Sequence, residues 1–188
     1  MQINGSIGDV IIAGGVESMS TAPFYIRNAR YGIGTGNTEL VDSNTESQQR
    51  AQPIEEYGNL TMGLTAENLA DRYAISREEQ DEFALRSQEL AKAAVEEGKF
   101  EKEIIPYEVK ERKSINIFKT DEHPRSTNIE KLSKLRPVFK ENGSVTAGNS
   151  SGRNDGASVV MVMSEEAVDK YSVKPKAKVV SQAVAVFP

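Results

Sequence analysis

The amino-acid sequence predicts an α/β fold in which strand-forming segments at both ends of the chain flank a large insertion of helices and loops. Three observations support this prediction. A short apolar run at residues 9–15 ends in two glycines, and a second apolar run without helical periodicity covers residues 157–163. Between them, the apolar residues of 65–98 recur near a 3.6-residue period. This order is typical of a sheet domain that is interrupted by an inserted segment.

The first apolar run, Asp9 to Gly15, is predicted to be a buried strand of an α/β sheet. Its two final glycines permit a sharp turn at the carboxyl end of the strand, where open sheets of this kind often place their sites. Residues 24–60 are predicted to be irregular, because they are rich in glycine and asparagine. Within them, Gly32 to Gly36 neither follows a convincing strand nor opens a helix, so these glycines are not assigned as a phosphate-binding loop.

The insertion is predicted to contain three helices. From Thr65 the chain is expected to be helical, with its apolar side chains on one face. A capping box at Ser76–Glu79 begins a second helix, which Gly98 is placed to end. A further capping box at Thr127–Glu130 opens a short helix that Pro137 stops.

Short strands are predicted at residues 104–109 and 115–118, and Pro106 weakens the first of them or places it at a sheet edge. The end of the chain is predicted to hold a central strand at 157–163, a helix at 165–171 and a last strand at 178–186.

The composition restricts the classes of function. The chain has 188 residues, of which 38% are hydrophobic and 27% charged, which suits one domain, or one domain plus pieces of another. A net charge of -5 without a basic stripe argues against nucleic acid as a partner. The first residues do not form a signal peptide, and no apolar run approaches the roughly 20 residues of a membrane span. We therefore expect a protein of the cytoplasm, or of a matrix-like compartment, that has no membrane partner.

The chain contains no cysteine. It can therefore form neither a disulfide nor a thiolate nucleophile, and no cysteine can bind a metal. The one histidine, His123, leaves little for a zinc site, so no metal is predicted. His123 lies in a polar loop segment and is interpreted as a solvated side chain rather than a catalytic one.

Four motifs occur in a fixed order along the chain. They are AGGVESMS at 13–20, MGLTAENLA at 62–70, SREEQD at 76–81, and VTAGNSSG at 145–152, which NDGA follows at 154–157. Together with LRPVF at 135–139 they resemble the thiolase family of acetyl-CoA acetyltransferases and acyltransferases. The similarity extends over nearly all 188 residues, and four motifs in order are far more specific than any one of them.

The resemblance implies a thiolase-like fold fragment from the interior of the family's chain. Residues 1–25 are similar to the end of the first of two α/β halves. Residues 26–150 are similar to the loop domain that is inserted in this half and faces CoA. Residues 151–188 are similar to the return to the first half and the first strand of the second half.

The implied reaction is condensation of two acetyl-CoA molecules or thiolysis of a 3-ketoacyl-CoA, as in fatty acid metabolism. It needs a cysteine nucleophile, a second cysteine for acid/base chemistry, and a histidine and an asparagine-held water for the oxyanions. In the family these groups lie before or after the segment represented here. The resemblance therefore assigns no catalytic residue to this chain, which is expected to be inactive by itself. A non-catalytic CoA-binding fragment or an inactive truncated product remains the alternative.

The resemblance also implies a CoA-binding surface, with CoA as substrate and no further cofactor. Such a surface needs cations for the phosphates, and small residues with available backbone groups for the pantetheine arm. Arg125 is similar to the family position at the nucleotide end of CoA, and Lys131 stands where some members have a serine facing the nucleotide. Met62 is similar to a residue near the acyl end. The positions similar to the cleft lining and to the pantetheine contacts are Val138, Phe139, Ala147 and Ser151.

Most of these assignments have a simpler alternative in the sequence alone. From the sequence alone, a solvated loop residue is the simpler interpretation of Arg125, and Lys131 is also compatible with a solvated cation. Phe139 is equally compatible with a core residue, and 146–152 with a tight turn. Thr61 stands where some thiolases have a histidine, which leaves the preferred acyl chain open. The family's members are commonly dimers or tetramers, so a homo-oligomer is expected for the full-length protein.

Overall fold

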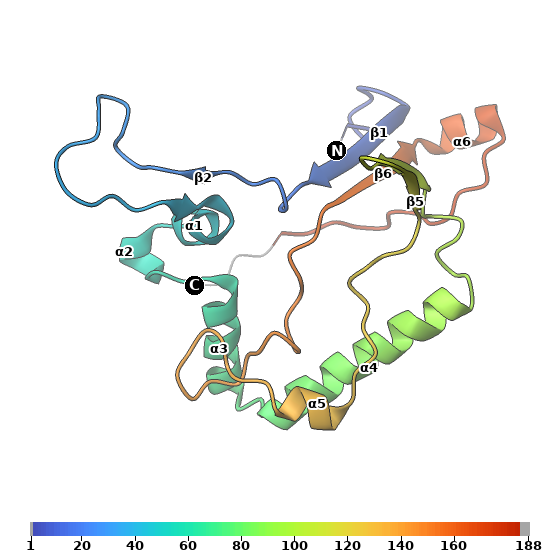
Figure 1. Cartoon of the computed structure of the whole chain (residues 1–188). Coiled ribbons are helices and arrows are strands. Elements are labelled where there is room, and N and C mark those ends of the chain that lie inside the picture. The colour runs from blue at the N-terminus through green and yellow to red at the C-terminus, as the bar shows by residue number, and fades with distance from the viewer. Residues whose placement is uncertain (1, 185–188) are drawn as a thin grey trace. The chain divides into compact units, whose positions relative to one another are not determined.

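The computed structural model describes residues 2–184, and the chain divides into two units (Figure 1). Unit 1 combines the residues up to Ser18 with those from Asp155 onward. Unit 2 is the continuous segment Met19–Asn154. The chain thus leaves unit 1 once, builds unit 2 and returns, and its mixed α/β structure has strands at both ends of unit 2.

Unit 1 is built on an antiparallel pair of strands, β1 (Val10–Glu17) and β6 (Gly156–Met163). The register pairs Val10 with Met163 at one end and Glu17 with Gly156 at the other. Helix α6 (Glu165–Tyr171) follows β6, and the Ser164 hydroxyl caps it by accepting from the Ala167 amide at 3.1 Å. The predicted strand at 157–163 and helix at 165–171 are therefore confirmed within one residue.

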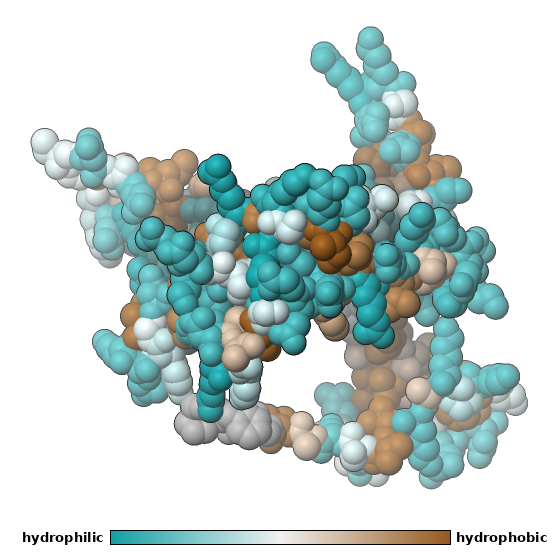
Figure 2. Space-filling view, turned by 90° about the horizontal axis from the view of Figure 1, so that it is seen from below, coloured by the Kyte–Doolittle hydropathy of each residue, from teal (hydrophilic) through white to brown (hydrophobic). Residues whose placement is uncertain are grey.

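The predicted burial of these strands is wrong. Ile12 is 70% exposed, Val16 80% and Val159 69%, and hydrophobic side chains lie open on the surface in several places (Figure 2). In the described residues β6 has β1 as its one neighbour, so it is not a central strand. A two-stranded sheet offers little cover for its faces, so apolar residues that suit a buried sheet remain in solvent.

The last predicted strand, 178–186, is also wrong over the residues that the structure describes. Residues 178–184 have no regular structure, and 185–186 lie outside the described residues. A strand forms only where a neighbouring strand takes up its backbone hydrogen bonds. No such neighbour exists in the described part of the chain, and Val180 is 90% exposed.

Unit 2 opens with a region that was expected to be irregular but contains short elements. Strands β2 (Phe24–Tyr25) and β3 (Val41–Asp42) pair, and helices α1 (Ser43–Arg50) and α2 (Ile54–Tyr57) follow. The Asp42 side chain begins α1 by accepting from the Asn44 amide at 3.0 Å. The α1 segment contains no apolar residue, so it has no apolar stripe that periodicity could reveal, and the cap is its clearest local signal.

Two longer helices form the middle of unit 2. Helix α3 (Met62–Tyr73) begins three residues before the predicted Thr65, because the Thr61 hydroxyl caps it by accepting from the Leu64 amide at 3.2 Å. Helix α4 (Arg77–Glu96) begins at the predicted capping box, which is confirmed. The Ser76 hydroxyl accepts from the Glu79 amide at 3.1 Å, and the Glu79 carboxylate accepts from the Ser76 amide at 2.8 Å.

A hairpin and a short helix follow. Strand β4 (Tyr107–Lys110) pairs with β5 (Ile115–Phe118); the bounds of β5 match the prediction, whereas β4 starts only after Pro106, which has no amide hydrogen to donate. Helix α5 (Ile129–Ser133) is capped by Asn128, which accepts from the Lys131 amide at 2.9 Å. The predicted capping box at Thr127–Glu130 is therefore wrong: the helix begins one residue later, with Asn128 as a simple cap and with Lys131, which has no acceptor, at the third helical position.

The buried residues of unit 2 gather where α3, α4 and α5 meet the 143–152 loop. Leu132 and Val145 are 4% and 5% exposed, and Thr146 is fully buried. Two carboxylates, Glu67 of α3 and Asp81 of α4, are buried with them.

Among the described residues, no helix is both long and apolar enough to cross a membrane.

Candidate functional site

Glu67 attaches the start of the 143–152 loop to helix α3. Its side chain is 1% exposed. One carboxylate oxygen accepts from the Val145 amide at 2.8 Å, and both oxygens accept from the Ser144 amide at 3.0 Å. The Ser144 hydroxyl also donates to Glu67 at 3.2 Å. A buried carboxylate thus has donors for both oxygens, all of them from the loop.

Asn149 closes the middle of the same loop and joins it to helix α4. Its Oδ1 accepts from the Thr146 amide at 2.7 Å, while its Nδ2 donates to the Ser144 carbonyl at 3.1 Å and to Asp81 at 3.0 Å. The other Asp81 oxygen accepts from Arg77 Nε at 2.7 Å. The loop is therefore fixed by two buried carboxylates from two helices.

Three of the segments predicted to face CoA lie side by side. The Phe139 ring packs directly on Gly63, next to Met62 at the start of α3. The Val138 amide donates to the Val145 carbonyl at 3.1 Å, which sets residues 137–139 beside 145–147. Met62 is 69% exposed, Val138 61% and Phe139 38%, and Ala147 is exposed beside the buried Thr146. Phe139 thus has both a packed face and an open one.

The remaining predicted residues lie on the 121–125 loop, on α5 and near the end of the 143–152 loop. The Arg125 amide donates to Gln88 of α4 at 2.8 Å, and the arginine side chain is exposed. Lys131 is exposed in the last turn of α5. Ser151 is exposed and precedes Gly152, where a Cβ would lie 2.5 Å from Nδ1 of His123. The 121–125 loop therefore runs against the end of the 143–152 loop.

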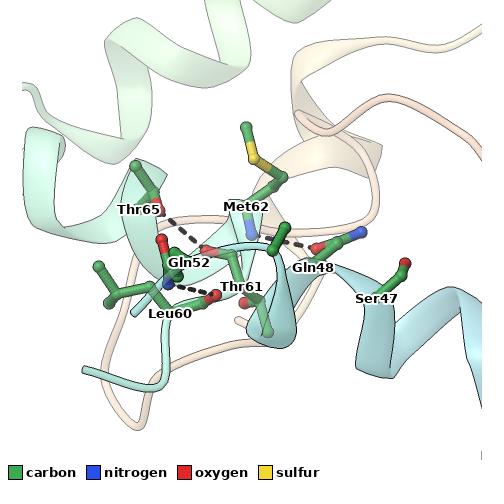
Figure 3. A pocket seen from close by; sticks show the side chains of 8 residues that line it. Ser47, Gln48, Gln52, Leu60, Thr61, Met62 and Thr65 are labelled. Atoms are coloured by element: carbon green, nitrogen blue, oxygen red, sulfur yellow. Dashed lines mark hydrogen bonds between the residues drawn. The ribbon is translucent and has the colours of Figure 1, made fainter. Parts of the chain in front are cut away.

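A pocket of about 450 Å³ lies between α1 and the start of α3 (Figure 3). The Gln48 side chain accepts from the Met62 amide at 3.1 Å, and Gln52 donates to the Leu60 carbonyl at 3.3 Å. Of the seven residues predicted to contact CoA, Met62 alone lines this pocket. The contribution of α1 was missed because α1 itself was not predicted.

Two charged groups of unit 2 have shifted pKa values. The pKa of Asp42 is lowered, first by the hydrogen bond from the Thr45 hydroxyl, then by the Asn44 amide and the Arg153 guanidinium. Arg153 lies 3.2 Å from Asp42 and so ties the end of unit 2 to the start of α1. The pKa of Lys140 is raised by its hydrogen bond and charge interaction with Asp71 and, more weakly, by the charge of Glu67.

Sequence reasoning missed the two buried carboxylates. A signal was present in α3, where the buried residues Gly63, Glu67 and Ala70 recur at helical spacing. A charged residue on the buried stripe of a helix needs hydrogen-bond donors from another segment. The two buried carboxylates hold the 143–152 loop in place with its small residues exposed, which suits ligand binding.

The described residues contain no cluster of three or more His, Cys, Asp or Glu side chains that could hold a metal.

Residues 2–166 match the family model described as "Thiolase, N-terminal domain". The chain is 46% identical over 190 residues to an acetyl-CoA acetyltransferase of Syntrophomonas wolfei, an alignment that covers 96% of this chain and 45% of that protein. It is 46% identical over 178 residues to the mitochondrial 3-ketoacyl-CoA thiolase of Rattus norvegicus, covering 94% of this chain and 44% of that protein. The chain thus spans less than half the length of the curated relatives it matches.

Solved structures show the same likeness. The crystal structure of the Bacillus anthracis acetyl-CoA acetyltransferase superposes with a TM-score of 0.85 at 45% identity, covering 93% of this chain and 43% of the other. The structure of human mitochondrial 3-ketoacyl-CoA thiolase in complex with CoA superposes with a TM-score of 0.82 at 44% identity, covering 93% and 42%. The order of elements described above is therefore shared with larger proteins.

Proposed function

Because the chain belongs to the thiolase family, we propose that it acts as part of an enzyme that transfers acyl groups between CoA thioesters. The reaction is condensation of two acetyl-CoA molecules or thiolysis of a 3-ketoacyl-CoA. The relatives named above are acetyltransferases and 3-ketoacyl-CoA thiolases, and one was solved with CoA bound.

One structural observation carries the proposal for this chain: the segments predicted to face CoA are neighbours in unit 2. Residues 137–139 lie beside 145–147, the Phe139 ring reaches the start of α3, and the 121–125 loop runs against residues 151–152. Their exposed side chains include a cation, small residues and apolar ones, as an extended ligand with phosphates and a pantetheine arm requires.

Within this surface we assign roles along the length of CoA. Arg125, with Lys131 as a second cation, binds phosphates at the nucleotide end. Ala147 and Ser151 contact the pantetheine arm, and Val138 and Phe139 line the cleft. Met62 lies toward the acyl end.

The chain itself supplies the binding surface and no nucleophile. Acyl transfer of this type passes through a thioester on a cysteine, and the sequence contains no cysteine. Catalysis therefore needs further polypeptide that brings the thiolates. The absence of cysteine from this chain also favours the second candidate function, which is CoA binding without chemistry.

A direct test measures CoA affinity by calorimetry in low salt, in the full-length thiolase that carries these residues. Arg125→Ala is expected to weaken CoA binding about tenfold, because a charge-assisted hydrogen bond to phosphate is lost. Arg86→Ala, which removes an exposed arginine from α4, is the matched control. Unchanged affinity in Arg125→Ala would remove the assignment of Arg125.

A second test separates the enzyme from the binding module. The 188-residue chain alone is incubated with acetoacetyl-CoA and CoA, and loss of the thioester is followed by absorbance. No turnover is expected from the chain alone. Turnover by the pure chain would contradict the proposal that a cysteine from further polypeptide is required.

Assembly and compartment belong to the same proposal. We propose a cytoplasmic homo-oligomer for the full-length protein, by analogy with other members of the family. Light scattering coupled to size-exclusion chromatography measures the assembly, and a monomer at micromolar concentration would contradict it.

A further inference from the structure

We propose that Glu67 and Asp81 are positioning residues for CoA, which fix the 143–152 loop in the conformation that receives the pantetheine arm. The proposal rests on the CoA-binding function proposed above. Neither carboxylate reaches the ligand surface: Glu67 is 1% exposed and Asp81 2%. Their effect on the ligand passes through the loop backbone.

The hydrogen bonds of Glu67 identify the loop as its partner. Within the part of the chain that the structure describes, every hydrogen bond that its carboxylate accepts comes from Ser144 or Val145, including both backbone amides. Hydrogen bonds to an ionised acceptor are about twice as strong as neutral ones, and a buried carboxylate without donors is strongly disfavoured. Displacing the start of the loop would therefore leave a buried charge without donors.

Asp81 acts on the middle of the loop through Asn149. The Asn149 amide both accepts from the Thr146 amide and donates to the Ser144 carbonyl, so one side chain closes the loop on itself. Asp81 takes the remaining Nδ2 hydrogen at 3.0 Å and thereby sets which end of the amide faces each partner. Arg77 in turn orients Asp81 and donates to the Leu132 carbonyl at 2.7 Å.

Close packing leaves the loop little freedom to move. Gly143 lies directly against the Glu67 carboxylate, with no room for a Cβ. A Cβ on Gly148 would lie 2.5 Å from a methyl carbon of Leu135 and 2.7 Å from one of Leu132. The loop is therefore confined between α3 on one side and the end of α5 on the other.

The exposed face of the confined loop is the one that carries the proposed ligand contacts. Val145 and Thr146 point inward and are buried, whereas Ala147 and Ser151 are exposed. A loop already held in its binding conformation loses little conformational freedom when a ligand binds, so affinity is higher than for a mobile loop. Loosening the two carboxylates should weaken binding of the arm while leaving the nucleotide end unaffected.

The experiment uses the full-length thiolase that carries these residues and three variants. Glu67→Gln keeps the size of the side chain but replaces one acceptor oxygen by a donor. Asn149→Asp keeps the acceptor for the Thr146 amide but sets a carboxylate against Asp81. The reversed pair, Asp81→Asn with Asn149→Asp, restores a donor and an acceptor. Glu89→Gln, an exposed glutamate of α4, is the matched control.

Each single variant is expected to raise the KM for CoA about tenfold with kcat within about twofold, as loss of a hydrogen bond to a charged group predicts. The reversed pair should recover only part of the Asn149→Asp loss, because it removes the two facing carboxylates but does not restore the donor to the Ser144 carbonyl. The inhibition constant of adenosine 3′,5′-bisphosphate, which represents the nucleotide end alone, should not change. Amide hydrogen exchange at Ser144 and Val145 should become faster in Glu67→Gln, while exchange in α4 stays the same.

Other outcomes overturn the inference in distinguishable ways. Faster exchange in the loop with an unchanged KM would show that the carboxylates hold the loop without positioning the ligand, and the CoA-binding proposal would stand. Equal weakening of CoA and of the bisphosphate, together with lower unfolding free energy, would reduce the carboxylates to a role in stability. Failure of the unsubstituted protein to bind CoA would overturn the proposed function and this inference together.

Discussion

The aromatic ring of Phe139 lies directly on Gly63, in the first turn of helix α3. The contact is so close that any Cβ at position 63 would overlap the ring. It joins two segments far apart in the sequence, and it leaves part of the Phe139 ring open on the proposed CoA surface. Gly63 is therefore required for a close approach rather than for backbone flexibility, since its φ is not in the left-handed region.

Gly63→Ala is expected to destabilise the protein. Alanine in a helix is worth up to about 1 kcal/mol over glycine, but overpacking costs about 1–3 kcal/mol, and the clash with a ring that must move should prevail. Urea unfolding measures the difference in free energy. Gly34→Ala, where a Cβ has open space, is the control. Equal stabilities of the two variants would contradict the contact.

Arg77→Lys is expected to destabilise the junction of α4 and α5. The guanidinium donates to Asp81, to the Leu132 carbonyl and, at 3.1 Å, to the Leu135 carbonyl, and a lysine cannot reach all three. The loss should be about 1–3 kcal/mol of unfolding free energy. Arg86→Lys, at an exposed position of the same helix, controls for the general effect of the substitution. A loss no larger than that of the control would show that the three bonds are replaceable.

The lowered pKa of Asp42 at the start of α1 predicts a dependence of stability on pH. The pKa of Asp42 is lowered in the folded protein, chiefly by the Thr45 hydroxyl. A carboxylate with a lowered folded pKa contributes stability above its unfolded pKa of about 3.9, and this contribution is lost as the pH falls through the folded pKa. Asp42→Asn retains a good helix cap but not the charge.

Stabilities of the unsubstituted protein and of Asp42→Asn should therefore differ by a constant amount between about pH 5 and 7 and converge below about pH 4. Chemical unfolding at a series of pH values measures this difference, with Asp121→Asn as the control for removing one negative charge. A difference in unfolding free energy that stays constant down to about pH 2 would contradict the lowered pKa of Asp42.

The open sheet of unit 1 predicts self-association of the 188-residue chain. Met161 and Ile12 are paired across β1 and β6 and are 60% and 70% exposed. An exposed apolar strand pair is a template for intermolecular contact. Met161→Lys should reduce concentration-dependent light scattering of the chain, whereas Ser158→Lys, on the other face, should reduce it less. Equal effects of the two variants would point to charge alone.

Local hydrogen-bonding signals in the sequence predicted the elements best. The Ser76–Glu79 box located the start of α4, because two reciprocal hydrogen bonds among four consecutive residues depend on nothing else in the fold. The residues of β5 were identified correctly for a similar reason, since a hairpin needs only its adjacent partner β4. Thr61 and Asn128 are residue types that commonly cap helices, so the sequence offers them as candidates. Which of several neighbouring candidates becomes the cap depends on how the helix packs.

Features that depend on distant contacts were predicted poorly. The segment 178–184 has strand-forming residues, but no neighbouring strand is present among the described residues to pair with it. Burial of β1 and β6 was expected from their apolar composition, which says nothing about what covers a sheet. The family resemblance predicts the CoA-facing residues, whereas the roles of Glu67 and Asp81 depend on hydrogen-bond partners more than sixty residues away in the sequence.

The pairing of Glu17 with Gly156 has a consequence for how the protein folds. The whole of unit 2 lies between these two residues, so the ladder of β1 and β6 can close only after an unusually long loop has been brought together. Loop-closure entropy grows with the logarithm of loop length, and non-local pairings slow folding. A unit 2 that has already collapsed shortens the effective loop. We therefore expect the contacts of α3, α4 and α5 to be present in the folding transition state, with high φ-values, and the β1–β6 ladder to form last.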